Sequence, residues 1–314
     1  MTKHPKVALT AEQQAVNARD VAAYDECLAY ARRHARGETE GFFGPGSMMW
    51  RLHRESVSLY PGLLRSVVMQ VAHPTLNTAA FTGDTKLVRN VRGRAAGTFN
   101  AMYSVIFGDL ASAIRTGTLV HRIHQSVWGT RVGPDGAEEP FRANDPELLL
   151  WVFATIVDSE VVGFTEINRP LTPAEEAQLW QEAKVLAALT GVPQAYVPAT
   201  WADFRQYVDT MVKGDALRVD ASLRAGCEAL AWRFVPLTVP PWLLRTAVVG
   251  IIPEGWRERA GFAWGGREQI AHAALKQTLR EANRRLPGAL RFPPPYHRAM
   301  KRLNLLAEPT PSLA

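Results

Sequence analysis

The chain is poor in cysteine. Cys27 and Cys227 are its only two cysteines in 314 residues, and they stand far apart in helix-like stretches. Two such thiols form neither a disulfide framework nor a four-ligand zinc site. We therefore expect two reduced, buried cysteines and a cytoplasmic protein.

The chain also lacks concentrated charge. Lysine and arginine number 36 against 30 acidic residues, for a net charge of +6 at pH 7, but no run of five or six basic residues occurs. Nucleic-acid-binding proteins normally gather basic residues on one face or carry a known module. We find neither and expect no nucleic-acid partner.

No apolar run is long enough to span a bilayer. The N-terminal residues 1–20 lack the apolar centre of a signal peptide. The strongest candidate, residues 239–253, is short and contains Arg245. Because Pro240-Pro241 precede it and Pro253 follows it, we predict a buried or interfacial helix there and no transmembrane segment.

Alternating apolar and polar residues, the pattern of half-buried strands, are almost absent. Only residues 130–141, with a turn at 134–136, resemble a hairpin. Helix starts are frequent instead, such as Thr10, Asp109, and the run Asn144-Asp145-Pro146-Glu147. We predict an all-α protein with a single helical domain.

Within this domain we expect three regions. Residues 1–40 form an N-terminal helix, residues 41–235 form the core, and residues 236–314 form C-terminal helices that pack on the core. The stretch 148–164 is apolar nearly all round and predicts the central buried helix. Asp158 in that helix is a buried carboxylate that requires a partner, for which Arg65, Arg94 and His124 are candidates.

The stretch from residue 91 to 129 predicts a functional site. It reads as two helices joined at residues 107–109. Arg94 and Thr98 share one face of the first helix, and His121 and His124 roughly share a face of the second. Buried polar groups cost free energy unless they are paired or bind something.

The residues alone leave the nature of this site open. A lone buried histidine is commonly a hydrogen-bonded core residue, so a haem-free helical binding protein is one alternative. The chain has neither the ligands of a structural zinc site nor the Glu-x-x-His motifs of a di-iron bundle. A haem needs only one axial histidine, and without Cys-x-x-Cys-His any haem would be non-covalent.

Several motifs follow one another in a characteristic order between residue 41 and the 230s. They are Gly41-Phe42-Phe43-Gly44-Pro45, Trp50-Arg51, Gln70-Val71-Ala72-His73-Pro74, Arg94-x-x-x-Thr98 leading to Phe107-Gly108, Val120-His121-Arg122-Ile123-His124 before Gly129, and the stretch from Asp145 to Val152 with Asp158-Ser159. In these motifs and their order the chain resembles the DUF2236 family, also called the MpaB oxygenase and rubber oxygenase (latex clearing protein) catalytic-domain family.

The resemblance implies a globin-like core that binds haem b. It also implies a haem-dependent oxygenase or oxidase that uses O2 or peroxide on a small or medium hydrophobic molecule. The family's proximal histidine falls on His124, and its distal arginine and threonine fall on Arg94 and Thr98. Latex clearing enzymes carry a lysine before that threonine, where this chain has Gly97. The substitution removes a distal lysine ligand and weighs against polyisoprene as the substrate.

Further cofactor contacts are predicted at His121 and Arg122, near a propionate, with a position at the protein surface as the alternative for both. They are also predicted at Thr155 and Asp158 on the central helix, where ordinary core packing is the alternative. His73 is a candidate distal group, with a capping or core role as the alternative. A haem-binding sensor or carrier without turnover is the alternative function, beside the haem-free binding protein.

Overall fold

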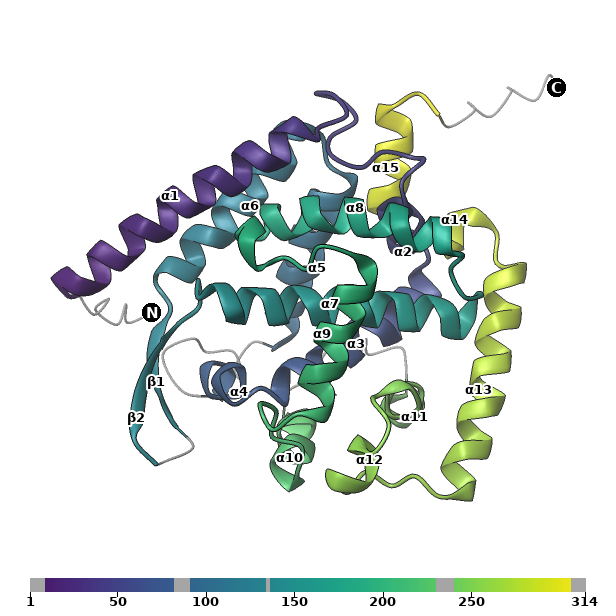
Figure 1. The fold of residues 1–314 in the computed structure, drawn as a ribbon. Coiled ribbons are helices and arrows are strands. Elements are labelled where there is room, and N and C mark those ends of the chain that lie inside the picture. Colours follow the sequence, from purple (N-terminus) through teal and green to yellow (C-terminus); the bar gives the residue numbers. More distant parts are fainter. Residues whose placement is uncertain (1–8, 82–90, 134–135, 230–239, 306–314) are drawn as a thin grey trace.

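Helix α7 (Pro146–Ile167) runs through the middle of the computed structural model, which describes residues 9–81, 91–133, 136–229 and 240–305 (Figure 1). The Asp145 side chain accepts a hydrogen bond from the Glu147 N–H at 3.0 Å, and Pro146 occupies the first turn. Both features fix the start of a helix. Its apolar residues are buried on most sides, so the predicted central helix is confirmed.

Helix α3 (Ser56–Val71) packs directly against α7, and two glycines permit the contact. A Cβ atom on Gly163 would lie 2.5 Å from the Ser58 carbonyl oxygen. A Cβ atom on Gly62 would lie 2.6 Å from the carbonyl oxygen of Ser159. The two backbones therefore meet at a separation that no larger residue allows.

Other helices surround this pair. On the N-terminal side of α7 in the chain they are α1 (Ala11–Arg33), α2 (Met48–His53), α4 (Pro74–Phe81), α5 (Val91–Phe107) and α6 (Leu110–Gln125). After α7 come α8 (Pro173–Leu189), the short 3-10 helix η1 (Gln194–Tyr196), α9 (Trp201–Lys213), α10 (Ala221–Ala229), α11 (Pro241–Ile251), α12 (Trp256–Arg259), α13 (Gly266–Arg285), α14 (Gly288–Arg291) and α15 (Pro294–Arg302).

One antiparallel hairpin accompanies the helices in the described residues. Strands β1 (Trp128–Val132) and β2 (Glu138–Arg142) pair with Trp128 opposite Arg142, and they project from the helical body (Figure 1). Part of the predicted turn, residues 134–135, lies outside the described residues. The all-α prediction is confirmed, whereas a globin-like arrangement of the helices stays a prediction.

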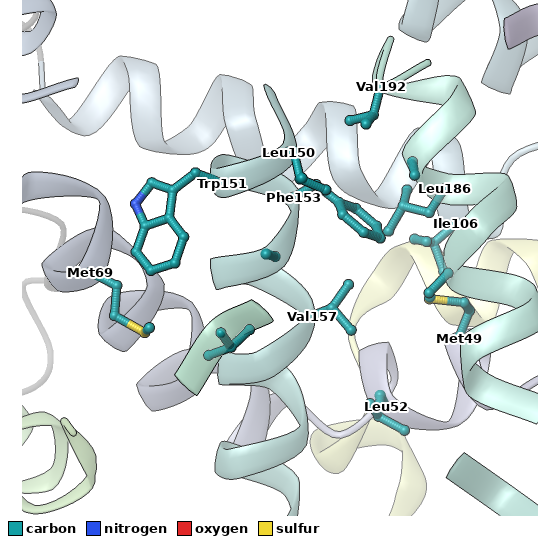
Figure 2. Close-up of a cluster of buried hydrophobic side chains, with 14 of the residues drawn as sticks. Met49, Leu52, Met69, Ile106, Leu150, Trp151, Phe153, Val157, Leu186 and Val192 are labelled. Atoms are coloured by element: carbon teal, nitrogen blue, oxygen red, sulfur yellow. The ribbon is translucent and has the colours of Figure 1, made fainter. Parts of the chain in front are cut away.

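The core lies on both sides of α7. Figure 2 shows Trp151 directed towards Met69 of α3, whereas Phe153 faces Leu186 of α8. Trp151 is fully buried, and Phe153 is 2% exposed. Burial of each such side chain contributes roughly 1.5–3 kcal/mol to folding. This packing on two sides explains why the helix is apolar nearly all round.

Among the described residues, α7 is the one helix long and apolar enough to cross a membrane, and 67% of its apolar window is buried inside the fold. Such burial is typical of a core helix. Helix α11, within the predicted segment 239–253, is shorter. Both cysteines are buried free thiols. The predicted boundary between residues 235 and 236 lies outside the described residues, and the three-region division stays a prediction.

Candidate functional site

Helices α5 and α6 are the two predicted helices joined at residues 107–109, and they contact each other. The Asp109 side chain caps α6 by accepting a hydrogen bond from the Ser112 N–H at 2.7 Å. Across the pair, the hydroxyls of Ser104 and Thr116 lie 2.8 Å apart and are hydrogen-bonded. Arg94 and Thr98 on α5 and His124 on α6 all lie on the side of this contact away from the 107–109 connection. The backbone thus brings the three predicted positions to one end of the helix pair.

One side of α5 is exposed near Gly97 and Thr98. Thr98 is exposed, and an added Cβ atom on Gly97 would meet no other atom within 4 Å. The backbone of α5 is therefore accessible to a bulky group at this position. The Arg94 backbone lies in α5, but its side chain lies outside the described residues.

His124 lies in the last turn of α6 and is half-buried. Its neighbours Ile123 and Gln125 line an open hollow of about 2150 Å³. The hollow is bordered by α1, α4, α10, the hairpin and the C-terminal ends of α3 and α6, and its walls include Val71, Val127, Trp128 and Phe141. The hollow therefore adjoins the last turn of α6, although His124 itself is not one of its lining residues.

His121 faces a different neighbour. Its ring stacks on Tyr24 of α1 with centroids 4.2 Å apart and planes 5° from parallel. The side chain is buried, and burial lowers the pKa of the imidazole. Neither ring nitrogen has a hydrogen-bond partner among the described residues. The imidazole therefore helps to join α1 to α6, and its predicted role near a propionate stays a prediction.

His73 lies between α3 and α4. Burial lowers the pKa of its imidazole to about 4, the charge of Arg131 adds to this effect, and Asp145 opposes it. The Nδ1 atom is buried and has no hydrogen-bond partner in the described part of the chain. Its main-chain oxygen accepts a hydrogen bond from the Asn77 N–H at 2.9 Å. The imidazole is therefore neutral near pH 7, close to the start of α7.

This histidine should make the fold sensitive to acid. An unfolded histidine titrates near pH 6.5, so between pH 6.5 and 4 the unfolded chain binds more protons than the folded chain. Stability should fall as the pH drops through that window, by roughly 1–2 kcal/mol from His73 between pH 7 and pH 5. Urea unfolding of wild type and His73→Gln at both pH values measures the difference. His34→Gln, which changes an exposed histidine, should retain the full acid loss, and equal losses in wild type and His73→Gln would contradict the prediction.

Thr155 and Asp158 of α7 both face neighbouring helices. Gln70 of α3 donates a hydrogen bond to the Thr155 hydroxyl at 3.0 Å. Arg65 donates to the Asp158 carboxylate at 2.7 Å, and Arg205 of α9 donates to its other oxygen. Of the predicted partners of Asp158, Arg65 is confirmed. The cofactor contacts predicted at Thr155 and Asp158 stay predictions, and both side chains have protein partners.

Two further features concern charged groups. Arg122 is exposed and lines the hollow. A second buried ion pair, which sequence reasoning missed, joins His53 of α2 to Glu160 of α7 at 3.0 Å. An acidic residue inside an apolar helix was the available signal for Glu160. No cluster of three or more His, Cys, Asp or Glu side chains suited to a metal ion occurs among the described residues.

The structure is thus an all-helical fold in which α6 carries the half-buried His124 and adjoins a mainly apolar hollow, while α5 carries the exposed Thr98 and the open position Gly97. Residues 50–281 match the family described as "ER-bound oxygenase mpaB/B'/Rubber oxygenase, catalytic domain". The chain belongs to this family, so the resemblance noted in its motifs is confirmed. The family is an oxygenase catalytic domain, which implies a small-molecule substrate and O2.

Two mycobacterial proteins are similar to the chain over most of their length. They are the uncharacterized proteins Mb2261 of Mycobacterium bovis and Rv2237 of Mycobacterium tuberculosis. Each is 26% identical over 235 residues, which cover 71% of this chain and 88% of the relative. No solved structure matches the chain significantly.

Proposed function

We propose that this protein is a haem b-dependent oxygenase that acts on a small or medium hydrophobic molecule. The observation that carries the proposal is the match of residues 50–281 to the oxygenase family, and within that region α5 carries Thr98 and the Arg94 backbone while α6 carries His124. His124 is the proposed proximal iron ligand.

The residues present fit such a cofactor. A haem requires one axial imidazole and room for a flat macrocycle. His124 is half-buried rather than enclosed, and the space beside Gly97 is open. The adjoining hollow is mainly apolar, as expected for a site that takes a hydrophobic substrate. When bound, haem would supply the activation of oxygen, and the protein would supply ligation, polarity and access.

The distal polar groups have separate roles in this proposal. The Arg94 guanidinium would stabilise negative charge by charge-assisted hydrogen bonds, which are the stronger kind. The Thr98 hydroxyl would donate a hydrogen bond or hold a water molecule. Arg122, exposed at the hollow, would pair with a carboxylate of the cofactor. Gly97 would leave the distal side wide.

A UV–visible spectrum tests the proposal. Protein purified from haem-supplemented cells should show a Soret band, and after reduction that band should shift when carbon monoxide is added. A shift indicates an iron with a sixth position that a ligand can reach. A colourless protein after adequate haem supply would contradict haem binding and favour the haem-free binding protein. A Soret band without oxygen consumption across hydrophobic substrates would favour the sensor or carrier.

A further inference from the structure

A continuous row of aromatic rings begins beside the candidate site. Phe99 directly follows Thr98 in α5, and it stacks on Tyr60 of α3 with centroids 5.3 Å apart. Its ring also lies 6.3 Å from that of Tyr103, one turn further along α5. Tyr103 in turn stacks on Phe107, with centroids 5.8 Å apart.

The row then leaves α5 and reaches the C-terminal helices. Phe107 meets Trp50 of α2 edge-on at 5.2 Å and Tyr296 of α15 at 5.8 Å. Trp50 and Tyr296 lie 5.8 Å apart, and Tyr296 lies 5.0 Å from Phe292. Tyr296 is 8% exposed and Phe292 is half-buried, so the row ends close to solvent.

Aromatic clusters are common in protein cores, where they stabilise packing. The order of residue types in this row is also suited to electron transfer. Tyr60, Tyr103, Trp50 and Tyr296 are oxidisable, and each is separated from the next by at most one phenylalanine ring. An electron hole can therefore move along the row in short transfers from one oxidisable ring to the next.

A buried base lies next to the row. The carboxylate of Glu160 and the ring of His53 form an ion pair at 3.0 Å, with both side chains at most 1% exposed. Burial raises the pKa of Tyr103 to about 12, and the charges of Tyr60 and Glu160 add to the increase. Glu160 is paired with His53 on α2, the helix that also carries Trp50 of the row, and it has no role in the proposed oxygenase site.

We propose that this row carries oxidising equivalents from the candidate site to Tyr296, which lies under the half-buried Phe292 near the surface, a function that rests on the proposed haem site. Its purpose would be to protect a site that meets an oxidant without substrate. With hydrogen peroxide as the oxidant, the O–O bond breaks and two water molecules form as two electrons and two protons are taken up. Two tyrosines of the row each give one electron and one proton and become neutral radicals.

The proton and electron movements balance within this scheme. Glu160, paired with His53, takes the proton that Tyr103 releases, the second phenol gives its proton to solvent, and the two protons consumed by peroxide come from solvent. An external donor, such as ascorbate or a thiol, then supplies two hydrogen atoms at the Tyr296 end, one for each radical, and Glu160 returns its proton to Tyr103 as that tyrosine is reduced through the row. The row is thereby returned to its starting state.

The experiment uses full-length protein whose haem content is verified by its Soret band. One equivalent of hydrogen peroxide is added without substrate, in the presence of a spin trap that adds covalently to tyrosyl radicals. Peptide mass spectrometry then locates the adduct, which we expect on Tyr296. Tyr103→Phe should abolish most of that adduct, because three consecutive phenylalanines would then interrupt the row.

Tyr207→Phe is the matched control. Tyr207 is a largely buried tyrosine of α9 that contacts Trp151 at 6.4 Å, outside the row, so its replacement should leave the Tyr296 adduct unchanged. Glu160→Gln keeps the side-chain volume but removes the base, and it should diminish the adduct as Tyr103→Phe does. An unchanged Tyr296 adduct in Tyr103→Phe, or no adduct on Tyr296 in haem-loaded wild type, would overturn the inference. A missing Soret band would instead overturn the proposed function, and the inference with it.

Discussion

Replacing Asp158 with alanine should lower the free energy of unfolding by about 3–5 kcal/mol. The carboxylate is 1% exposed, and it neutralises the buried guanidinium of Arg65 as well as that of Arg205. Arg65 also donates hydrogen bonds to the Ser159 hydroxyl and the Ile251 carbonyl oxygen, each at 2.7 Å, so its position is fixed. Without Asp158 a buried positive charge would remain without its counter-ion, which is the costly case for an ion pair.

Urea unfolding measures this loss, with the same slope of unfolding free energy against urea concentration in the variant and the wild type. Arg205→Ala is the control, because the Arg205 side chain is 47% exposed and exposed ion pairs contribute only about 0–1 kcal/mol. Equal losses of unfolding free energy in Asp158→Ala and Arg205→Ala would show that the ion pair of Asp158 with Arg65 is not the main contribution of Asp158 to stability. Asp158→Asn also separates structure from cofactor binding, since an unchanged Soret band in that variant would argue against the predicted cofactor contact.

His124→Ala should abolish haem binding, the largest functional effect we expect. A haem held without covalent bonds depends on its axial ligand. The measurement is the ratio of Soret to protein absorbance after purification from haem-supplemented cells. Circular dichroism establishes that the variant remains helical.

His121→Phe is the matched control for this loss. His121 lies one turn before His124 on the same helix, but its ring stacks on Tyr24 of α1. Phenylalanine preserves that stacking, so the variant should keep its Soret band. The reverse result, with haem retained in His124→Ala and lost in His121→Phe, would contradict the assignment of His124 and identify His121 as the iron ligand.

Local signals made most of the helices predictable from the sequence. Asp109, Asp145 and Thr10 cap helices through hydrogen bonds to backbone N–H groups within three residues, so the signal and its effect lie together in the chain. The same applies to the α5–α6 pair, because a short connection between two helices places them next to each other.

Contacts between distant parts of the chain were harder to predict. The pairing of Asp158 with Arg205, and the stacking of His121 on Tyr24, depend on how α9 and α1 pack on the core. No residue pattern within either helix marks its partner. The carboxylate of Asp158 indicated that a cation was needed, but only the packing of the helices determined that two arginines would meet it.

The meeting of Gly62 and Gly163 has a mechanical consequence. The α3 and α7 backbones touch there, whereas nearer to the start of α7 they are bridged by longer side chains such as Gln70 and Thr155. Because α3 ends just before His73, its angle at the glycine crossing determines where His73 lies. A larger residue in place of Gly62 or Gly163 would change that angle and displace His73, so the position of this candidate distal group depends on two residues outside the candidate site.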